Sequence, residues 1–165
     1  MHAMKVGRIP KSLENGQVRL DLIGPLSWFT YYKLFKDVDL RILHQLGYHK
    51  DSGRFKAFWF SLYLFNFAYL IRYNNQPVGV VGIYQWQPGR SLFLTLAILK
   101  DGFFGKGIGS TSLKILLTAF AKTNLCRKVL IEVKNDNVKA LRFWKRHGFR
   151  IVNETRLTYI LDLII

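Results

Sequence analysis

Apolar residues along the chain recur with two different periods. Short alternating or continuous apolar runs are typical of strands, whereas apolar residues three and four positions apart indicate a helix. Strands are therefore predicted over residues 18–23, 67–73, 78–86, 91–99, 128–133, 149–153 and 157–163. Helices are predicted to begin after Ser27, to span residues 41–46 (ending at Gly47) and 54–64, and to run from Gly107 to Lys122 and from Asn137 to Gly148.

Turn-forming residues separate the central strands. Residues 74–77 predict a turn, and Pro88 with Gly89 predicts a type II turn that joins two strands as an antiparallel hairpin. Gly79 and Gly82 lie inside a predicted strand, where glycine either weakens the strand or admits a close neighbour. The order of elements predicts an α+β fold, with a central, mostly antiparallel mixed sheet of about seven strands and helices on both faces.

Charge is distributed unevenly along the chain. Its 165 residues are predicted to form a single domain over residues 1–165, with residues 1–17 expected to be poorly ordered. The chain has 25 Lys and Arg against 10 Asp and Glu, and residues 100–150 hold 12 of the cations with only Asp101, Glu132 and Asp136 as acids. This basic third is predicted to face an anion, although charge alone does not separate a nucleic acid from a phosphorylated cofactor.

Composition also disfavours several kinds of site and location. Cys126 is the only cysteine, which excludes an internal disulfide, fits a reducing compartment and is interpreted as a buried apolar residue rather than a nucleophile. Residues 1–10 lack a secretory signal, so a cytoplasmic location is expected. The most apolar segment, residues 57–71, is too short to span a membrane. No metal site is predicted.

A glycine-rich loop joins the predicted strand 91–99 to the helix that follows. Such a loop can direct successive backbone N–H groups, together with the positive end of the helix dipole, at an anion. The alternative is an ordinary strand-to-helix turn. The spacing of the glycines fits neither the phosphate loop of nucleoside triphosphatases nor the dinucleotide fingerprint. The glycines are Gly102, Gly105, Gly107 and Gly109.

Two motifs together carry a resemblance to a known family. The loop is similar to the acetyl-CoA loop of the GCN5-related N-acetyltransferase (GNAT) family, in which Arg or Gln is followed after two residues by Gly, any residue, and Gly or Ala. About 25 residues later the chain resembles the family's fifth strand and the helix after it. The resemblance covers residues 67–163. The residues that match this second motif are Ile131, Glu132, Val133, Asn137, Ala140, Gly148 and Phe149, with Trp144 at the family's Tyr position.

The resemblance implies a GNAT fold and acetyl-CoA as cosubstrate. Phe104 stands at the family's Arg or Gln position, which removes one polar contact to the pyrophosphate. Backbone N–H groups near Ile98 and Leu99 would polarise the thioester carbonyl, and Asn137 and Trp144 would contact the pantetheine arm. The loop residues implied to bind the cofactor are Phe104, Gly105, Lys106, Gly107, Ile108, Gly109 and Ser110.

Glu132 matches the family's proposed general base. It is expected to be buried, which would make it a stronger base, and to take a proton from the acceptor ammonium directly or through water. The alternative is a strand carboxylate paired with Lys134 or Arg142. Asn137 is at least a helix cap, a role compatible with a contact to the pantetheine arm.

Trp144 cannot supply the acidic proton of the tyrosine that it replaces, because an indole N–H has no useful acidity. Tyr84 or Tyr159 could protonate the departing thiolate instead, or the thiolate could take its proton from water. His147 is interpreted as a surface residue. The nine aromatic residues between Phe55 and Tyr73 either fill the core or form an acceptor site.

The function that the resemblance implies is transfer of an acetyl group from acetyl-CoA to a primary amine. The acceptor would be a protein N-terminus, an amino-sugar nucleotide or another small amine. A GNAT-like module that has lost activity and binds RNA or a ribosome through its basic surface is the less favoured alternative. A membrane-surface protein is less favoured still, and the oligomeric state, including a homodimer, is left open.

Overall fold

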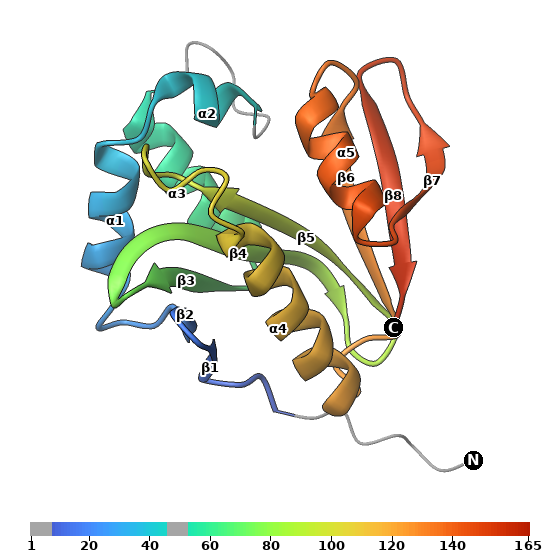
Figure 1. The fold of residues 1–165 in the computed structure, drawn as a ribbon, viewed down its shortest axis with the longest axis horizontal. Coiled ribbons are helices and arrows are strands. Elements are labelled where there is room, and N and C mark those ends of the chain that lie inside the picture. The colour runs from blue at the N-terminus through green and yellow to red at the C-terminus, as the bar shows by residue number, and fades with distance from the viewer. Residues whose placement is uncertain (1–7, 46–52) are drawn as a thin grey trace.

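A computed structural model of the chain describes residues 8–45 and 53–165 (Figure 1). Within these ranges, the side chains of residues 44, 45 and 55 are not described. In chain order the elements are β1 (Ser12–Asn15), β2 (Val18–Leu22), α1 (Trp28–Lys36), α2 (Leu40–Gln45), α3 (Arg54–Leu64), β3 (Phe67–Tyr73), β4 (Gln76–Gln87), β5 (Ser91–Ile98), α4 (Ile108–Lys122), β6 (Lys128–Lys134), α5 (Val138–Arg146), β7 (Arg150–Glu154) and β8 (Thr158–Ile164).

The strands form one mixed sheet in the order β1-β2-β3-β4-β5-β6-β8-β7. Every neighbouring pair is antiparallel except β5 and β6, which are parallel. The sheet has eight strands rather than about seven, because the short polar segment of β1 has no apolar alternation to reveal it. Residues 12–15 of this strand lie within the segment 1–17 that is expected to be poorly ordered, and residues 1–7 lie outside the described part.

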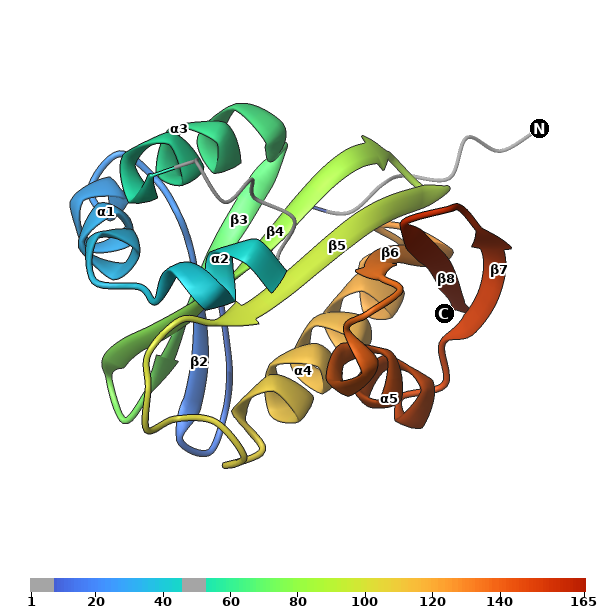
Figure 2. The ribbon, with the colours of Figure 1, turned by 90° about the horizontal axis from the view of Figure 1, so that it is seen from above.

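Helices cover both faces of the sheet, as predicted. Figure 2 shows α1, α2 and α3 on one face and α4 and α5 on the other. Each set encloses its own apolar core: Phe35 and Phe58 pack against Val80 on the first face, and Leu116 and Phe120 of α4 pack against Val81 on the second. Among the described residues, no helix is both long enough and apolar enough to cross a membrane.

The two strand glycines admit close neighbours. A Cβ atom on Gly79 would lie 2.3 Å from the carbonyl oxygen of Ala97, and one on Gly82 would lie 2.2 Å from the ring of Phe65. The hairpin between β4 and β5 also forms as predicted: the N–H of Arg90 donates to the carbonyl of Gln87 at 2.9 Å, and Gly89 has φ +71°. These contacts hold β4 tightly between β3 and β5.

Ser27 does not cap α1 through its side chain. Its hydroxyl accepts a hydrogen bond from the N–H of Gly24 at 2.9 Å and can donate to the carbonyl of the same residue at 3.2 Å, so it closes the preceding turn. The predicted end of the second helix at Gly47 lies outside the described residues. Helices α3 and α4 begin and end at the residues that their apolar periodicity predicts.

Candidate active site

A cleft of about 1810 Å³ opens where β5 and β6 separate. These parallel strands pair only from Ser91–Phe93 to Lys128–Leu130, and beyond that point they share no ladder of hydrogen bonds. The cleft is lined by residues 94–98 of β5, the start of α4, residues 132–137 and the turn between β7 and β8. Its volume exceeds the usual size of a single small-molecule pocket.

The backbone of β5 presents alternate peptide groups to this cleft. The N–H of Leu99 donates to the carbonyl of Val78 at 2.8 Å, so that peptide group faces β4. Because hydrogen-bonding direction alternates along an antiparallel strand, the N–H of Ile98 faces the opposite edge, toward β6. Ile98 lines the cleft and Leu99 is buried with its N–H occupied. Of the two residues predicted to polarise the thioester carbonyl, Ile98 directs its N–H toward the cleft and Leu99 does not.

The glycine loop leaves unbonded N–H groups at the start of α4. Gly105 and Gly107 have φ values of +75° and +73°, a backbone conformation that residues other than glycine rarely adopt. Gly107 is the N-cap residue, and the first helical hydrogen bond joins the N–H of Thr111 to its carbonyl at 2.9 Å. The N–H groups of residues 108–110 therefore precede the helical ladder and remain for a ligand.

Most of the predicted loop residues line the cleft. Phe104, Gly105, Gly107, Ile108, Gly109 and Ser110 do so. Lys106 does not: its ammonium lies over the ring of Phe103, 5.0 Å from the ring centre. The exposed ring of Phe104 adds apolar surface where the family has a polar side chain.

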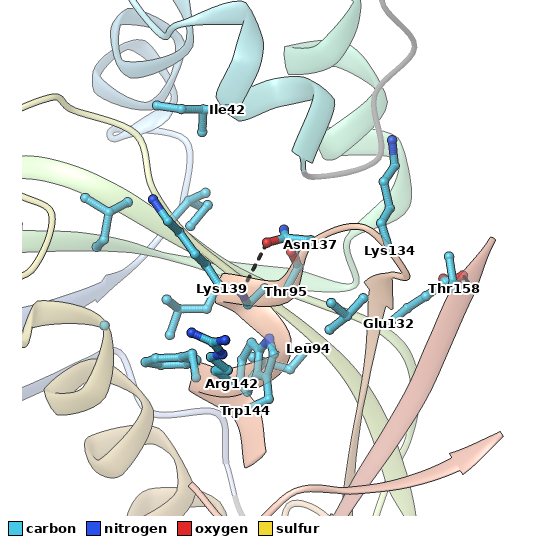
Figure 3. Close-up of a pocket in the computed structure, with 18 of the residues that line it drawn as sticks. Ile42, Leu94, Thr95, Glu132, Lys134, Asn137, Lys139, Arg142, Trp144 and Thr158 are labelled. Atoms are coloured by element: carbon cyan, nitrogen blue, oxygen red, sulfur yellow. Dashed lines mark hydrogen bonds between the residues drawn. The ribbon is translucent and has the colours of Figure 1, made fainter. Parts of the chain in front are cut away.

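Helix α5 forms the opposite wall of the cleft (Figure 3). The side-chain oxygen of Asn137 accepts a hydrogen bond from the N–H of Ala140 at 3.1 Å, which confirms the predicted cap. Its amide nitrogen has no partner among the described residues and lines the cleft. Trp144 is buried and packs edge-on against Phe143 and Phe149, so it acts mainly as a core residue that touches the cleft with one side.

Glu132 lies on the cleft wall, but it is exposed rather than buried. Strand β6 alternates, so Ile131 and Val133 enter the core and Glu132 faces outward. Its carboxylate accepts a hydrogen bond from the hydroxyl of Thr158 at 2.9 Å. No ion pair joins Glu132 to Lys134 within the described residues, nor to any other cation there. The expected burial is wrong, and so is the alternative of a paired strand carboxylate.

Among the described tyrosines, Tyr84 lines this cleft. Burial raises the pKa of Tyr84 to about 12, with a smaller contribution from the negative charge of Glu132. Its ring lies between Phe65 and Phe93, with centroids 6.4 and 5.3 Å away. Tyr159 pairs with Val133, next to Glu132, but it does not line the cleft and instead packs against the main core. Of the two tyrosines considered from the sequence, only Tyr84 lines the cleft.

A sequence model of the acetyltransferase (GNAT) family matches residues 28–149. The chain belongs to this family. Members use acetyl-CoA as cosubstrate. The match spans both walls of the cleft.

Relatives of this GNAT chain agree with that assignment. An uncharacterized N-acetyltransferase of Methanocaldococcus jannaschii is 34% identical over 95 residues, and the spermine/spermidine N(1)-acetyltransferase of Bacillus subtilis is 27% identical over 63. The matches cover 57% and 38% of this chain but only 58% and 41% of the relatives' lengths.

Solved structures show the same fold. The ribosomal L7/L12 alpha-N-protein acetyltransferase RimL, without ligand, superposes with a TM-score of 0.76 at 19% identity, covering 93% of this chain and 95% of that one. The same enzyme in complex with coenzyme A gives a TM-score of 0.72 at 21% identity, covering 95% and 97%. At these identities the likeness shows the GNAT fold.

Two polar residues of this GNAT cleft were not predicted. Thr158 orients Glu132 from across the strand pair, and Asn135 ties the end of β6 to the β7–β8 turn. The side-chain nitrogen of Asn135 donates to the carbonyls of Thr155 and Arg156 at 3.3 Å each, whereas its buried side-chain oxygen has no partner. Only strand register brings these residues together, and no local pattern in the sequence announces it.

Cys126 and His147, for which no catalytic role is predicted from the sequence, lie outside the cleft. Cys126 is buried in the core, and burial raises the pKa of its thiol to about 11, which suppresses a nucleophilic thiolate. His147 shares a hydrogen bond with the carbonyl of Phe143 at 2.8 Å and does not line the cleft. The aromatic cluster divides: Phe58 fills the core, whereas Phe60 lines the cleft.

Proposed function

We propose that this GNAT chain transfers the acetyl group of acetyl-CoA to the amine of a protein N-terminus, with Glu132 as general base. One observation carries the proposal. An oriented carboxylate, an unsatisfied helix N-terminus and an unpaired edge of β5 line the same cleft. The likeness to RimL supports a protein N-terminus over other primary amines. A cytoplasmic location fits this acceptor.

The residues present suit acetyl-CoA. Backbone N–H groups of residues 108–110 would hold the pyrophosphate, supported by the positive end of the α4 dipole. The free edge of β5 would pair with the amide groups of the pantetheine arm, and the amide nitrogen of Asn137 would bond to the same arm. The N–H of Ile98 would polarise the thioester carbonyl and stabilise the negative charge that develops on its oxygen.

Glu132 would then accept a proton from the acceptor ammonium, directly or through a water molecule. The freed nitrogen lone pair would form the new C–N bond at the carbonyl carbon, the attached nitrogen would lose its second proton to water, and the C–S bond would break as the tetrahedral intermediate collapses. Tyr84 stays protonated at neutral pH and can donate a hydrogen bond to the departing sulfur, which finally takes its proton from water. Thr158 would keep the carboxylate of Glu132 in place.

The test is the substitution Glu132→Gln, assayed by thiol release with acetyl-CoA and a panel of peptide amines. We expect unchanged CoA affinity and a fall in kcat of about 10²- to 10⁴-fold, the usual contribution of a positioned base. Much of the loss should return at high pH, where the amine deprotonates unaided. Asp136→Asn is the matched control, because Asp136 also lines the cleft and has no assigned role. Full activity of Glu132→Gln with an unchanged pH profile would remove Glu132 from catalysis.

The RNA- or ribosome-binding alternative predicts a different outcome. In that case no amine would be acetylated, and RNA affinity would fall steeply as salt is raised. Turnover on any amine would refute a purely binding role.

A further inference from the structure

Cations outnumber acids on the walls of the cleft. Six Lys and Arg side chains line it, against the carboxylates of Glu132 and Asp136. None of the six forms an ion pair within the described part of the chain. Their charges are therefore available to ligands. They are Lys134, Lys139, Arg142, Lys145, Arg146 and Arg156.

These cations fall into two groups. Four belong to α5, and in Figure 3 Lys139 and Arg142 extend toward the side of the glycine loop, where the phosphates of the cosubstrate would lie. Lys134 extends instead from the end of β6 toward α2 and α3. The α5 group suits the cosubstrate, which leaves Lys134 for another ligand.

Lys134 and Arg156 lie next to the proposed base. Lys134 follows Glu132 by two positions, so both side chains leave the same face of β6 with Cα atoms about 7 Å apart. Arg156 lies in the adjoining turn, where Asn135 donates to its backbone carbonyl, and it lines the cleft two positions before Thr158, which bonds to Glu132. Both cations are thus placed to meet the part of the acceptor that follows the reacting amine.

Among the residues whose side chains are described, the facing wall is apolar. It is formed by Ile42 of α2, Phe60 and Leu64 of α3, and Phe65 after it, with no charged residue among them. Figure 3 shows Ile42 directed into the cleft from the side opposite Glu132. An extended peptide places successive side chains on opposite sides. Such a peptide would present one side chain to the cations and the next to this apolar wall.

Resting on the proposed function, we infer that the acceptor is a polypeptide N-terminus with an acidic side chain close behind the reacting amine, selected by Lys134 and Arg156. Glu132 supplies one negative charge beside the acceptor amine, and the two unpaired cations favour a further negative charge on the acceptor itself. Polyamines are the opposite case, because every additional amine would face Lys134, Arg156 and a chain of net charge +15. This enzyme should therefore not share the substrate of the spermine/spermidine relative.

The experiment compares two peptides that begin with the same serine and differ only in the second residue, Glu or Lys, followed by Leu in both. With wild-type enzyme we expect kcat/KM to favour the Glu peptide by about three- to tenfold at low salt, as two exposed charge pairs allow, and the preference to shrink as salt is raised. Lys134→Gln and Arg156→Gln should each reduce the preference and raise the KM for the Glu peptide. The KM for acetyl-CoA should not change.

Two control variants separate the cation groups. Lys139→Gln should raise the KM for acetyl-CoA and leave the peptide preference intact. Lys114→Gln removes the same charge from an exposed position of α4 outside the cleft and should change neither. CoA binding by each variant shows that it is folded.

The outcomes separate this inference from the function on which it rests. Equal turnover of both peptides, or a preference for Lys, would overturn the acidic acceptor while leaving peptide acetylation in place. Turnover confined to spermidine or to an amino-sugar nucleotide would overturn both the peptide acceptor and its charge preference. Retention of the full preference by the double variant of Lys134 and Arg156 would overturn the assignment to these cations.

Discussion

Gly107 offers a sharp test of where the pyrophosphate binds, because the chain contains a matched control. Gly107 and Gly102 both have positive φ values, +73° and +79°, and a Cβ atom added at either position would meet nothing within 4 Å. Only Gly107 lines the cleft. Alanine at either position therefore introduces similar backbone strain. Alanine at Gly107, but not at Gly102, also places a methyl group where the pyrophosphate is proposed to bind.

The expected magnitudes follow from this difference. A left-handed backbone costs an alanine about 1 to 2 kcal/mol, so both variants should unfold a few degrees below the wild type. At Gly107 the methyl group also stands beside the N–H groups of residues 108–110, where a phosphate must approach. Loss of one charge-assisted hydrogen bond is worth about 1.5 to 3 kcal/mol, or about a ten- to hundredfold loss of CoA affinity.

Calorimetric titration with CoA and thermal melting measure the two effects separately. Gly102→Ala should bind CoA like the wild type despite its lower melting temperature. Gly107→Ala should lose affinity by the amount above, and its melting temperature should rise less when CoA is added. If both variants bind CoA equally well while folded, the pyrophosphate does not lie on the α4 N-terminus.

Four further predictions concern other parts of the molecule. Trp144→Phe should change kcat little and act through packing, whereas Trp144→Tyr, measured beside it, should match or exceed wild-type turnover by placing a phenol at the family's position. Tyr84→Phe should lower kcat by about tenfold or less, because one hydrogen bond to the departing sulfur is lost. The pKa of Cys126 is raised to about 11 from an ordinary value of 9.0, so its contribution to stability is complete below pH 9 and is lost as the pH rises toward 11. That loss is about 2 to 3 kcal/mol at most and should be absent from Cys126→Ala in denaturant titrations at pH 8 and 11. Gly79→Ala forces a methyl group to within 2.3 Å of a strand carbonyl, and a soluble variant with wild-type stability would contradict that geometry.

Local chemistry made much of the fold predictable from sequence. Apolar periodicity alone located α3 and α4, and the cap at Asn137 and the turn at Gly89 follow from the preferences of single residues. Strand β1 was missed because it is stabilised by pairing with β2 rather than by an apolar face of its own. The glycine loop and the motif around Glu132, taken together, also indicate the family, because both consist of residue types at fixed spacing along the chain.

The working geometry of the cleft depends on tertiary structure. Strand register brings Thr158 to Glu132, and the direction of one hydrogen bond to Val78 decides that Ile98 rather than Leu99 faces the cleft. The cleft beside Glu132 likewise exists because β5 and β6 stop pairing after Phe93 and Leu130. Sequence determines what each segment prefers over a few residues. Contacts between distant segments depend on how the strands pair, and that pairing is settled by the packing of the whole sheet against the helices on both of its faces.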